Sequence, residues 1–389
     1  MHKTRVLVFL TTVLVVGIVG TIAAFYARGY RFNPDGELTS NGLLVANSEP
    51  TGASVLVDGQ LQTASNATIP LPEGNYDVIL KKEGYLQWSK RLTVTAEVVT
   101  QIDVSLFASA PSLSAVTFAG SFNPNLSPDF TKIAYGVPAT VENIESDKEG
   151  LWLLDTGNLP LGFNREPRRI TDGDLSEATW DWSPDSRQIL LTISNAVFLL
   201  NTSDFTAQAN RVNVATQKVQ IQAEWEVESR QRLDAQLSKL PDEFQDILKN
   251  KATEVVFAPN ENKILYTATA SAHWQDDLVK QLPGSSTQKQ SRDIKADTKY
   301  VYDIKEDRNF EISSANQPVY WFPTSHHVVI PEEGKISIMD YDGTNKQTVF
   351  SGSYVYPFAF ATVANTRLII LTNFGAAESA GNLYSLGIK

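Results

Sequence analysis

Hydrophobic and polar positions follow three patterns along this chain, one after another. From Val6 to Ala27 there is no charged residue, and most side chains are aliphatic. Residues 42–107 alternate between apolar and polar positions in short runs. From residue 112 onward, short apolar runs return behind a shared turn phrase. These patterns are typical of a membrane-spanning helix, a small β domain and a repeated β architecture, in that order.

The N-terminal run is long enough to cross a membrane. About 22 residues at roughly 1.5 Å each cover roughly 33 Å, against a hydrocarbon core of about 30 Å. A cleaved signal peptide is the alternative, but its apolar core is shorter and ends in an Ala-x-Ala-like site. Only Thr21 with Ala23 fits such a site here. We therefore predict a membrane anchor at residues 1–31 that sits in the lipid bilayer, with cleavage left open.

The charge distribution predicts the orientation of this anchor. The first 31 residues hold four Lys/Arg and no acid, so the remainder carries 29 Lys/Arg against 44 Asp/Glu. Long domains translocate largely regardless of their charge. We therefore expect a single-pass protein of a bacterial cell membrane, with a cytoplasmic N-terminus and extracytoplasmic C-terminal domains.

Residues 32–110 predict a small β-sandwich. Its runs alternate with period two and are separated by turns such as Asp58-Gly59. Four spaced blocks are Glu49-Pro-Thr-Gly-Ala53, Val55-Leu-Val-Asp-Gly59, Leu71-Pro-Glu-Gly-Asn-Tyr76 and Lys82-Glu-Gly-Tyr-Leu-Gln-Trp88. The set resembles the PEGA domain, which implies a β-sandwich of bacterial and archaeal surface proteins without known catalytic residues. Tyr85 and Trp88 either seal the end of the sandwich or offer an aromatic platform to a glycan.

One phrase recurs through the rest of the chain. It joins a Pro with Asp, Asn or Ser neighbours, which starts a tight turn, to an apolar strand. The fourth copy is degenerate and the fifth lacks the proline. The copies are Leu126-Ser-Pro-Asp-Phe-Thr-Lys-Ile-Ala-Tyr135, Trp182-Ser-Pro-Asp-Ser-Arg-Gln-Ile-Leu-Leu191, Phe257-Ala-Pro-Asn-Glu-Asn-Lys-Ile-Leu-Tyr266, Phe322-Pro-Thr-Ser-His-His-Val-Val-Ile330 and Phe360-Ala-Thr-Val-Ala-Asn-Thr-Arg-Leu-Ile-Ile-Leu371.

Further strands after each phrase give about four strands per unit, which is the composition of a β-propeller blade. Residues 111–389 therefore predict a propeller of about five or six blades, so the chain as a whole is mainly β. Residues near Leu113–Ala119 are expected to pair with the last blade. The phrase resembles the Ser-Pro-Asp-Gly phrase of TolB-like and WD40-like propellers, with Phe130 or Ser186 in place of Gly. The order of anchor, PEGA-like domain and propeller resembles PEGA-containing membrane proteins of small-genome bacteria.

Two insertions interrupt the blade rhythm. Residues 224–251 are rich in Glu, Gln, Arg and Leu, with apolar residues at helical spacing from Leu233 to Leu248. They predict a helical hairpin that either packs on its own blade or docks a partner. Residues 276–299 are polar and predict a long mobile loop.

Composition and motifs exclude several functions. The chain has no cysteine, which excludes disulfides and thiolate metal sites, and its pI near 5.0 argues against nucleic acid as a partner. No Gly-x-Ser-x-Gly elbow or phosphate loop is present. His326 and His327 are adjacent, so they cannot share one helix face. Asp340–Gly343 resembles the start of a calcium loop without its later acid, and Asp172–Asp174 is a turn. We predict no catalytic, cofactor-binding or metal residues, and no enzyme.

Three functions remain as hypotheses. The first is a membrane-anchored cell-envelope binding or scaffolding protein, with a propeller head on a PEGA-like stalk. Its partner is an envelope protein docked on the hairpin at 224–251, or a cell-wall polymer held by exposed aromatics such as Trp88 or Trp274. The second is an envelope sensor or assembly factor for other membrane proteins. The third is a propeller hydrolase or lyase.

Overall fold

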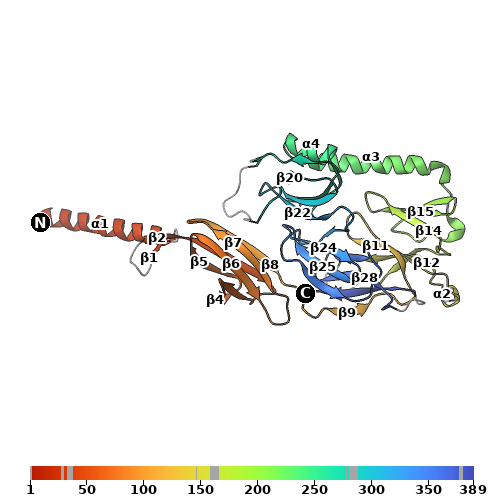
Figure 1. Cartoon of the computed structure of the whole chain (residues 1–389), viewed down its shortest axis with the longest axis horizontal. Coiled ribbons are helices and arrows are strands. Elements are labelled where there is room, and N and C mark those ends of the chain that lie inside the picture. The colour runs from red at the N-terminus through yellow and green to blue at the C-terminus, as the bar shows by residue number, and fades with distance from the viewer. Residues whose placement is uncertain are drawn as a thin grey trace. The chain divides into compact units, whose positions relative to one another are not determined.

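The chain forms two compact units. Residues 1–107 with 280–289 make the first, and residues 108–279 with 290–389 make the second. The computed structural model describes residues 2–27, 30–32, 38–145, 147–157, 166–276, 278–279, 288–375 and 380–389. Figure 1 labels the elements of both units.

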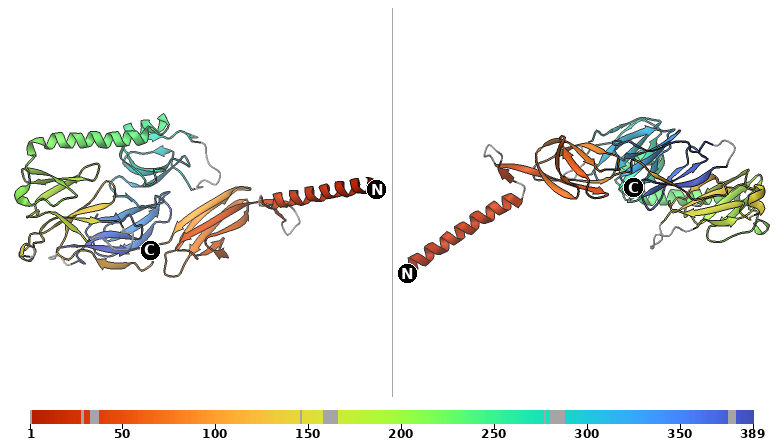
Figure 2. Two further views of the ribbon diagram at one scale, coloured as in Figure 1. Left: turned by 180° about the vertical axis from the view of Figure 1, so that it is seen from behind. Right: turned by 90° about the horizontal axis from the view of Figure 1, so that it is seen from below.

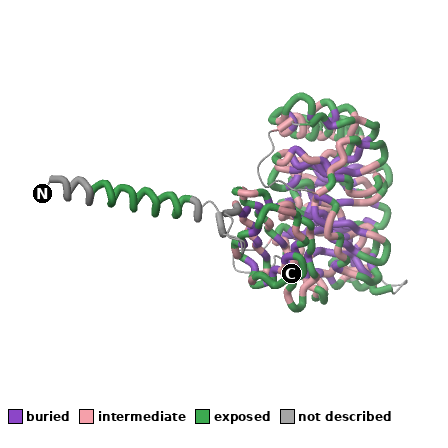
Figure 3. The backbone as a smooth tube through the Cα atoms, turned by 60° about the vertical axis from the view of Figure 1, so that its left-hand side comes forward, coloured by how far each residue is buried: buried purple, intermediate pink, exposed green. Residues whose placement is uncertain are grey.

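Helix α1 (His2–Ala27) begins the first unit. Its side chains are described from residue 9 to residue 24, and all of them are exposed, as the green part of the helix in Figure 3 shows. Among the described residues, no helix has both the length and the apolar character of a membrane span. The structure therefore does not support the predicted anchor at residues 1–31, whose outer side chains lie outside the described part.

The rest of the first unit is a sandwich of two sheets. One sheet has the order β1-β2-β5, with β8 parallel to β2, and the other has the order β4-β3-β6-β7. The strands are β1 (Tyr30–Phe32), β2 (Leu38–Glu49), β3 (Ser54–Val57), β4 (Gln60–Ala64), β5 (Ala67–Pro72), β6 (Gly74–Lys81), β7 (Trp88–Val94) and β8 (Val99–Ser105). Buried residues of both sheets, such as Leu44 and Leu80, share one hydrophobic core.

Local sequence accounts for the strands of this sandwich. β5 and β6 bury alternate residues, as their apolar–polar alternation predicts. Asp58 and Gly59 both adopt positive φ, at 47° and 79°, between β3 and β4. Two left-handed residues make the tight hairpin turn whose twist matches the flanking strands.

The described residues of the second unit form five antiparallel sheets of three or four strands, numbered here as blades one to five, and one two-stranded sheet, β19-β20. Blade one is β10 (Phe122–Leu126), β11 (Lys132–Val137), β12 (Gly150–Asp155) and β13 (Arg168–Thr171). Blade two is β14 (Ala178–Trp182), β15 (Gln188–Ile193) and β16 (Ala196–Asn201). Blade three is β17 (Ala252–Phe257), β18 (Lys263–Ala268), β21 (Thr298–Asp303) and β22 (Arg308–Ser314). Blade four is β23 (Tyr320–Trp321), β24 (His327–Glu332), β25 (Lys335–Asp340) and β26 (Gln347–Ser351).

Blade five is built from both ends of this unit. It consists of β27 (Ala359–Ala361), β28 (Arg367–Thr372), β29 (Asn382–Gly387) and β9 (Ser112–Ala115). β9 pairs antiparallel with β29, so that Leu113 lies opposite Leu386. This pairing confirms the predicted closure of the ring by residues near Leu113.

Hydrophobic clusters join most neighbouring blades. One cluster joins blades one and two, a second joins blades one and five, and a third joins blades three and four. Tyr320 of blade four faces Phe360 of blade five, with 6.2 Å between ring centroids. No cluster found among the described residues joins blade two to blade three. The ring is closed there by a helix instead.

Three α-helices belong to the second unit: α2 (Val141–Glu145), α3 (Lys218–Leu237) and α4 (Asp242–Asn250). Two short 3-10 turns, Gln208–Asn210 and Ala215–Gln217, precede α3. α3 and α4 occupy the segment that the sequence predicted to be helical, and α3 begins six residues earlier, at Lys218 rather than at residue 224. Figure 2 shows α3 extended beside the blades.

The segment at 276–299 is not one continuous loop. β20 (Asp293–Ile294) pairs with β19 (Ala272–His273), and β21 begins at Thr298. Ile294 is buried in the core of blade three. The predicted mobile loop was therefore too long at its C-terminal end, because its polar composition concealed this short buried strand. Residues 277 and 280–287 lie outside the described part of the chain.

Candidate functional site

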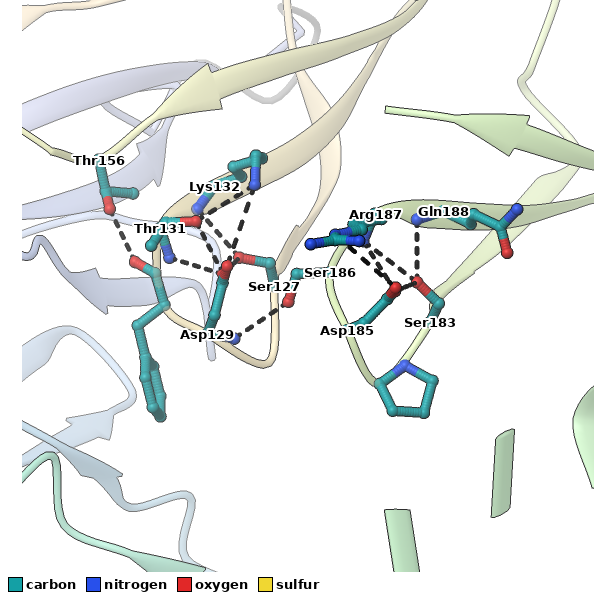
Figure 4. Close-up of polar contacts among 12 residues, drawn as sticks. Ser127, Asp129, Thr131, Lys132, Thr156, Ser183, Asp185, Ser186, Arg187 and Gln188 are labelled. Carbon is teal, nitrogen blue, oxygen red and sulfur yellow. Dashed lines mark hydrogen bonds and ion pairs between the residues drawn. The ribbon is translucent and has the colours of Figure 1, made fainter. Parts of the chain in front are cut away.

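The repeated phrase forms the same turn in every blade, between the first and second strands. In blade two, Ser183 Oγ donates to Asp185 Oδ1 at 2.6 Å and accepts the backbone N–H of Gln188 at 2.9 Å. In blade one, Ser127 makes the equivalent bonds to Asp129, at 2.6 Å, and from Lys132, at 3.0 Å. Figure 4 shows the two turns side by side. The serine therefore ties the Pro-Asp corner to the strand that follows.

The fourth position of each turn is left-handed. Its φ lies between 50° and 62° in all five blades, at Phe130, Ser186, Glu261, Ser325 and Asn365. Glycine reaches this conformation most easily, which explains why it ends the Ser-Pro-Asp-Gly phrase of TolB-like propellers. The degenerate fourth copy and the proline-free fifth copy keep the same backbone, so they are true members of the repeat.

Hydrogen bonds hold the aspartates of these turns in the charged form. The Ser183 hydroxyl and the Arg187 backbone N–H lower the pKa of Asp185. Burial acts to raise the pKa of Asp129, but hydrogen bonds from Ser127 and Thr131 outweigh it and lower that pKa. Both carboxylates are thus fixed parts of the turns.

The turns also link neighbouring blades. The backbone N–H of Asp129 in blade one donates to Ser186 Oγ in blade two at 3.2 Å, as Figure 4 shows. Trp182 Nε1 of blade two donates to the carbonyl of Asn125 in blade one at 3.1 Å. These two bonds hold the turn of blade one against blade two.

The same pair of bonds recurs between blades three and four. The N–H of Asn260 donates to Ser325 Oγ at 3.1 Å, and Trp321 Nε1 donates to the carbonyl of Val256 at 3.0 Å. At the junction of blades two and three, the tryptophan position holds Phe257, which has no N–H to donate. The serine position there holds Glu261.

Helix α3 makes the connection that these residues cannot make. Arg232 Nη1 on α3 donates to the carbonyl of Pro184 in the blade-two turn at 2.9 Å. Gln236 Nε2 donates to Glu261 Oε1 in the blade-three turn at 3.1 Å, and Lys239 Nζ lies 3.3 Å from Glu261 Oε2. The Gln236 and Lys239 contacts lower the pKa of Glu261. α3 therefore connects the turns of blades two and three across their junction, and we refer to it as the strut.

The sequence of α3 suits a solvated strut. Ion pairs one turn apart join Arg230 to Glu226 at 2.9 Å and Arg232 to Glu228 at 2.7 Å. Leu237, at the end of the helix, is its one buried residue. Ion pairs one turn apart stabilise a helix that is largely exposed to solvent.

A groove of about 880 Å³ lies beneath this strut. We call it the α3 groove. Val255, Val256 and Phe257 of β17 in blade three line it, and Val256 is 40% exposed. Its apolar lining includes Phe130, Trp182, Trp225, Leu233, Val256 and Phe257, and its charged groups are Asp129, Asp185, Glu226, Glu261 and Arg232. Four carboxylates against one guanidinium give the groove a negative bias.

Trp88 and Trp274, which were predicted from the sequence to be exposed and able to bind a glycan, lie in the protein interior. Trp88 is 5% exposed and packs in the sandwich core with Tyr85 beside it, as the sealing interpretation expected. Trp274 is fully buried, and its ring centroid lies 4.5 Å from that of Tyr302 and 5.4 Å from that of Phe244. The interpretation of Trp88 and Trp274 as exposed platforms was therefore wrong, because lone tryptophans between polar neighbours also fill cores.

His327 comes nearest to a catalytic arrangement. Its Nδ1 lies 3.0 Å from Thr324 Oγ1, and its Nε2 lies 3.6 Å from Asp340 Oδ1. However, His327 is buried and faces Asp340 across β24 and β25, as Lys263 faces Asp303 in blade three. The repeat therefore explains this hydroxyl–imidazole–carboxylate order as a structural cross-strand pair.

The remaining candidates are turns. The N–H of Gly343 donates to the carbonyl of Asp340, and Thr344 Oγ1 donates to Asp342 Oδ1 at 2.6 Å. Gly173, between Asp172 and Asp174, has a φ of 92°. Within the described ranges, no group of three or more His, Cys, Asp or Glu residues is placed to hold a metal ion.

Sequence reasoning missed the α3 groove. Phe257, which begins the third copy of the phrase, is only half-buried, since it borders the groove. Trp225, a single aromatic residue on an otherwise polar helix, was the one available signal.

Residues 41–109 match the family model of the PEGA domain. No curated protein sequence matches the chain at a significant level. Among solved structures, TolB from Acinetobacter baumannii is similar at 11% identity and a TM-score of 0.21, over 90% of this chain and 64% of that one. A protein assigned as TolB from Agrobacterium tumefaciens is similar at 12% identity and a TM-score of 0.20, over 80% of this chain and 90% of that one. An acylaminoacyl peptidase from Pyrococcus horikoshii is similar at 12% identity and a TM-score of 0.23, over 70% of this chain and 39% of that one. The chain thus spans less than two thirds of the Acinetobacter protein.

Proposed function

We propose that this chain is a membrane-anchored binding protein of the bacterial cell envelope, which holds a polypeptide partner in the α3 groove without chemical turnover. The PEGA domain at residues 41–109 supports the envelope setting, since the resemblance implies surface proteins. The uncharged residues from Val6 to Ala27 are the support for the anchor. The α3 groove is the observation that carries the binding role.

The lining of the groove favours a polypeptide over a glycan. Sugar sites present several polar groups oriented toward the hydroxyls of the ligand. Three of the four carboxylates here are instead oriented by bonds within the protein. Asp185 is bonded to Ser183, Glu226 to Arg230 and Glu261 to Gln236. Apart from Ser229, Arg232 and Gln236, the remaining lining is aliphatic, aromatic and proline carbon, which matches apolar side chains.

The charge of the groove further limits the kind of polypeptide that it would bind. An apolar segment flanked by Lys or Arg complements four carboxylates and one guanidinium. Charges of this kind steer a partner of opposite charge, so their main effect is expected on the association rate, and added salt should slow association.

A photo-crosslinking experiment tests the binding role. A photoreactive amino acid at Ser229, which lines the groove, should capture one protein in intact cells, whereas the same group at Val219 on the same helix should not. The captured protein, once identified and purified, should bind the full chain saturably. Val256→Asp should weaken that binding at least tenfold, and Val219→Asp should leave it unchanged.

Three results would count against the proposal. The first is a photoreactive group at Ser229 that crosslinks to wall fragments alone. The second is equal capture by the same group at Val219. The third is turnover of ester or peptide substrates that the variant Thr324→Val abolishes.

Topology is tested separately. Protease added to spheroplasts should digest the chain beyond about Arg31, because the proposal places everything after the anchor on the outer side of the membrane. A protected full-length band would show the opposite orientation. Sequencing of the mature N-terminus distinguishes an anchor from a cleaved signal peptide.

A further inference from the structure

We infer that this chain associates with a second copy of itself through a surface at the other end of blade one from the α3 groove. The groove is lined by turns between first and second strands. The surface proposed here is formed by described residues of three connections: 116–121 between β9 and β10, 138–145 and 147–149 between β11 and β12, and 373–375 and 380–381 between β28 and β29. In an antiparallel blade, consecutive connections lie at opposite ends.

The first of these loops holds an aromatic side chain in solvent. Asn382 Oδ1 accepts hydrogen bonds from Thr117 Oγ1 at 3.1 Å and from the N–H of Gly120 at 3.0 Å. Thr117 Oγ1 lies 2.8 Å from Ser121 Oγ, and both residues are buried. Between these fixed points Phe118 is 84% exposed. A ring presented by a rigid loop loses little conformational freedom when a partner covers it.

An apolar pocket lies directly beside this ring. Its volume is about 420 Å³, and Phe118 forms part of its edge. The side chains of Tyr135, Val137 and Trp152 line it, and Trp152 is fixed by its Nε1 donating to the carbonyl of Lys148 at 2.8 Å. The surface thus presents a protruding aromatic and a hole of matching character next to each other.

More apolar side chains surround the pair. Val141 and Ile144 of α2 and Phe374 of the loop between β28 and β29 are all exposed. The three loops meet at Gly120, where an added Cβ would lie 2.9 Å from Ala380 and 3.2 Å from Pro138. Several large exposed apolar residues on adjoining loops mark an interaction surface.

The charges and the geometry of this surface indicate which partner binds to it. Glu142 and Glu145 lie on α2 among the apolar residues, which opposes contact with an anionic lipid surface. A two-fold interface needs the protrusion and its hole on the same patch. Lys148 and Glu166, which carry opposite charges, both line the pocket, and the dimer inferred here pairs Lys148 of each copy with Glu166 of the other. A second copy of this chain satisfies both requirements.

Sedimentation of the full chain in mild detergent tests this inference. The expected result is a concentration-dependent dimer. Phe118→Ser and Lys148→Glu should each weaken dimerisation at least tenfold, and the double variant Lys148→Glu with Glu166→Lys should restore it. Val256→Asp, in the α3 groove, should leave the dimer intact, which separates this surface from the proposed binding role. Circular dichroism melts confirm that each variant is folded.

A disulfide reporter gives an independent readout, because the chain has no native cysteine. Chains carrying Lys148→Cys mixed with chains carrying Glu166→Cys should form mixed disulfide dimers under mild oxidation. Chains carrying Val219→Cys should not. A monomer at all concentrations, a dimer unaffected by Phe118→Ser, or a charge swap that fails to restore dimerisation would each overturn the inference.

Discussion

At the scale of single residues, the turn serine has the largest structural role for its size. Ser183 is buried, and its one hydroxyl donates to Asp185 and accepts from Gln188. It satisfies a backbone N–H that would otherwise lie without a partner in the interior. Ser127 makes the equivalent bonds in blade one.

Replacing Ser183 should cost stability out of proportion to its volume. Ser183→Ala leaves the Gln188 N–H unpaired, at an expected cost of about 1–3 kcal/mol in the free energy of unfolding. Urea denaturation measures this difference. Ser203→Ala, at an exposed serine outside the repeat, is the matched control and should change the free energy by less than about 0.5 kcal/mol. Equal effects at both serines would contradict the role assigned to the turn.

The Asp185 carboxylate should make stability depend on pH at the acidic end. Its pKa lies below the usual value of about 3.8, because hydrogen bonds stabilise the charged form in the folded state. Its contribution is therefore complete above pH 3.8 and is lost as the pH falls through the lowered pKa. Asp185→Asn should flatten the loss of stability between about pH 4 and pH 2, measured by thermal melts. An unchanged pH profile would show that this carboxylate is not linked to folding.

Trp182 connects the residue scale to the element scale, since it fills blade two and donates to blade one. Trp182→Ala should destabilise the second unit by about 3–5 kcal/mol, as expected for the loss of a large buried side chain. Trp182→Phe, which keeps most of the volume but lacks the N–H, should cost much less. Chemical denaturation followed by far-ultraviolet circular dichroism measures both.

At the scale of elements, the sequence predicted the existence of the strands and helices better than their roles. Alternation and the turn phrase identified the blades, and leucine spacing identified α3 and α4. The strut role of α3 could not be predicted, because it depends on Pro184 and Glu261, which lie far from the helix in sequence. The α3 groove was hidden for the same reason, since three blades contribute to its lining.

Breaking α3 should loosen one junction without unfolding the unit. Glu228→Pro removes a hydrogen bond in the helix interior and should melt its middle, at about 3 kcal/mol of helix stability. Hydrogen exchange should then quicken in α3 and in β17 while blades one and five stay protected. Val219→Pro, near the helix start, is the control and should affect the first turn alone. Uniform loss of protection would show that α3 is a core element instead.

Another prediction concerns the segment first taken for a mobile loop. Arg292 Nη1 lies 3.0 Å from Asp307 Oδ1, and Asp307 is fully buried. Arg292→Met leaves that carboxylate without its cation and should cost about 3–5 kcal/mol. Arg187→Met, at an exposed arginine, should cost little. A negligible effect at Arg292 would mean that residues 288–299 do not contribute to the core.

At the scale of the whole molecule, the two compact units should unfold separately. The core of the first unit is made of its own sheets, and the blades form cores of their own. Calorimetry of the full chain should show two transitions, and residues 38–109 expressed alone should give one of them. Trp182→Ala should shift one transition and leave the other in place. A single transition shifted by that variant would show the units to be coupled.

The closure of blade five has a consequence for synthesis. β9 leaves the ribosome early, but the hydrogen bond that fixes its following loop joins Thr117 to Leu383, 266 residues later. At about 5–20 residues per second, the ribosome takes roughly 13–53 s to make that interval. During this time β9 is an unpaired strand edge, and blades one to four exist before the ring can close. We therefore expect β9 to be the strand that most needs a chaperone on the nascent chain.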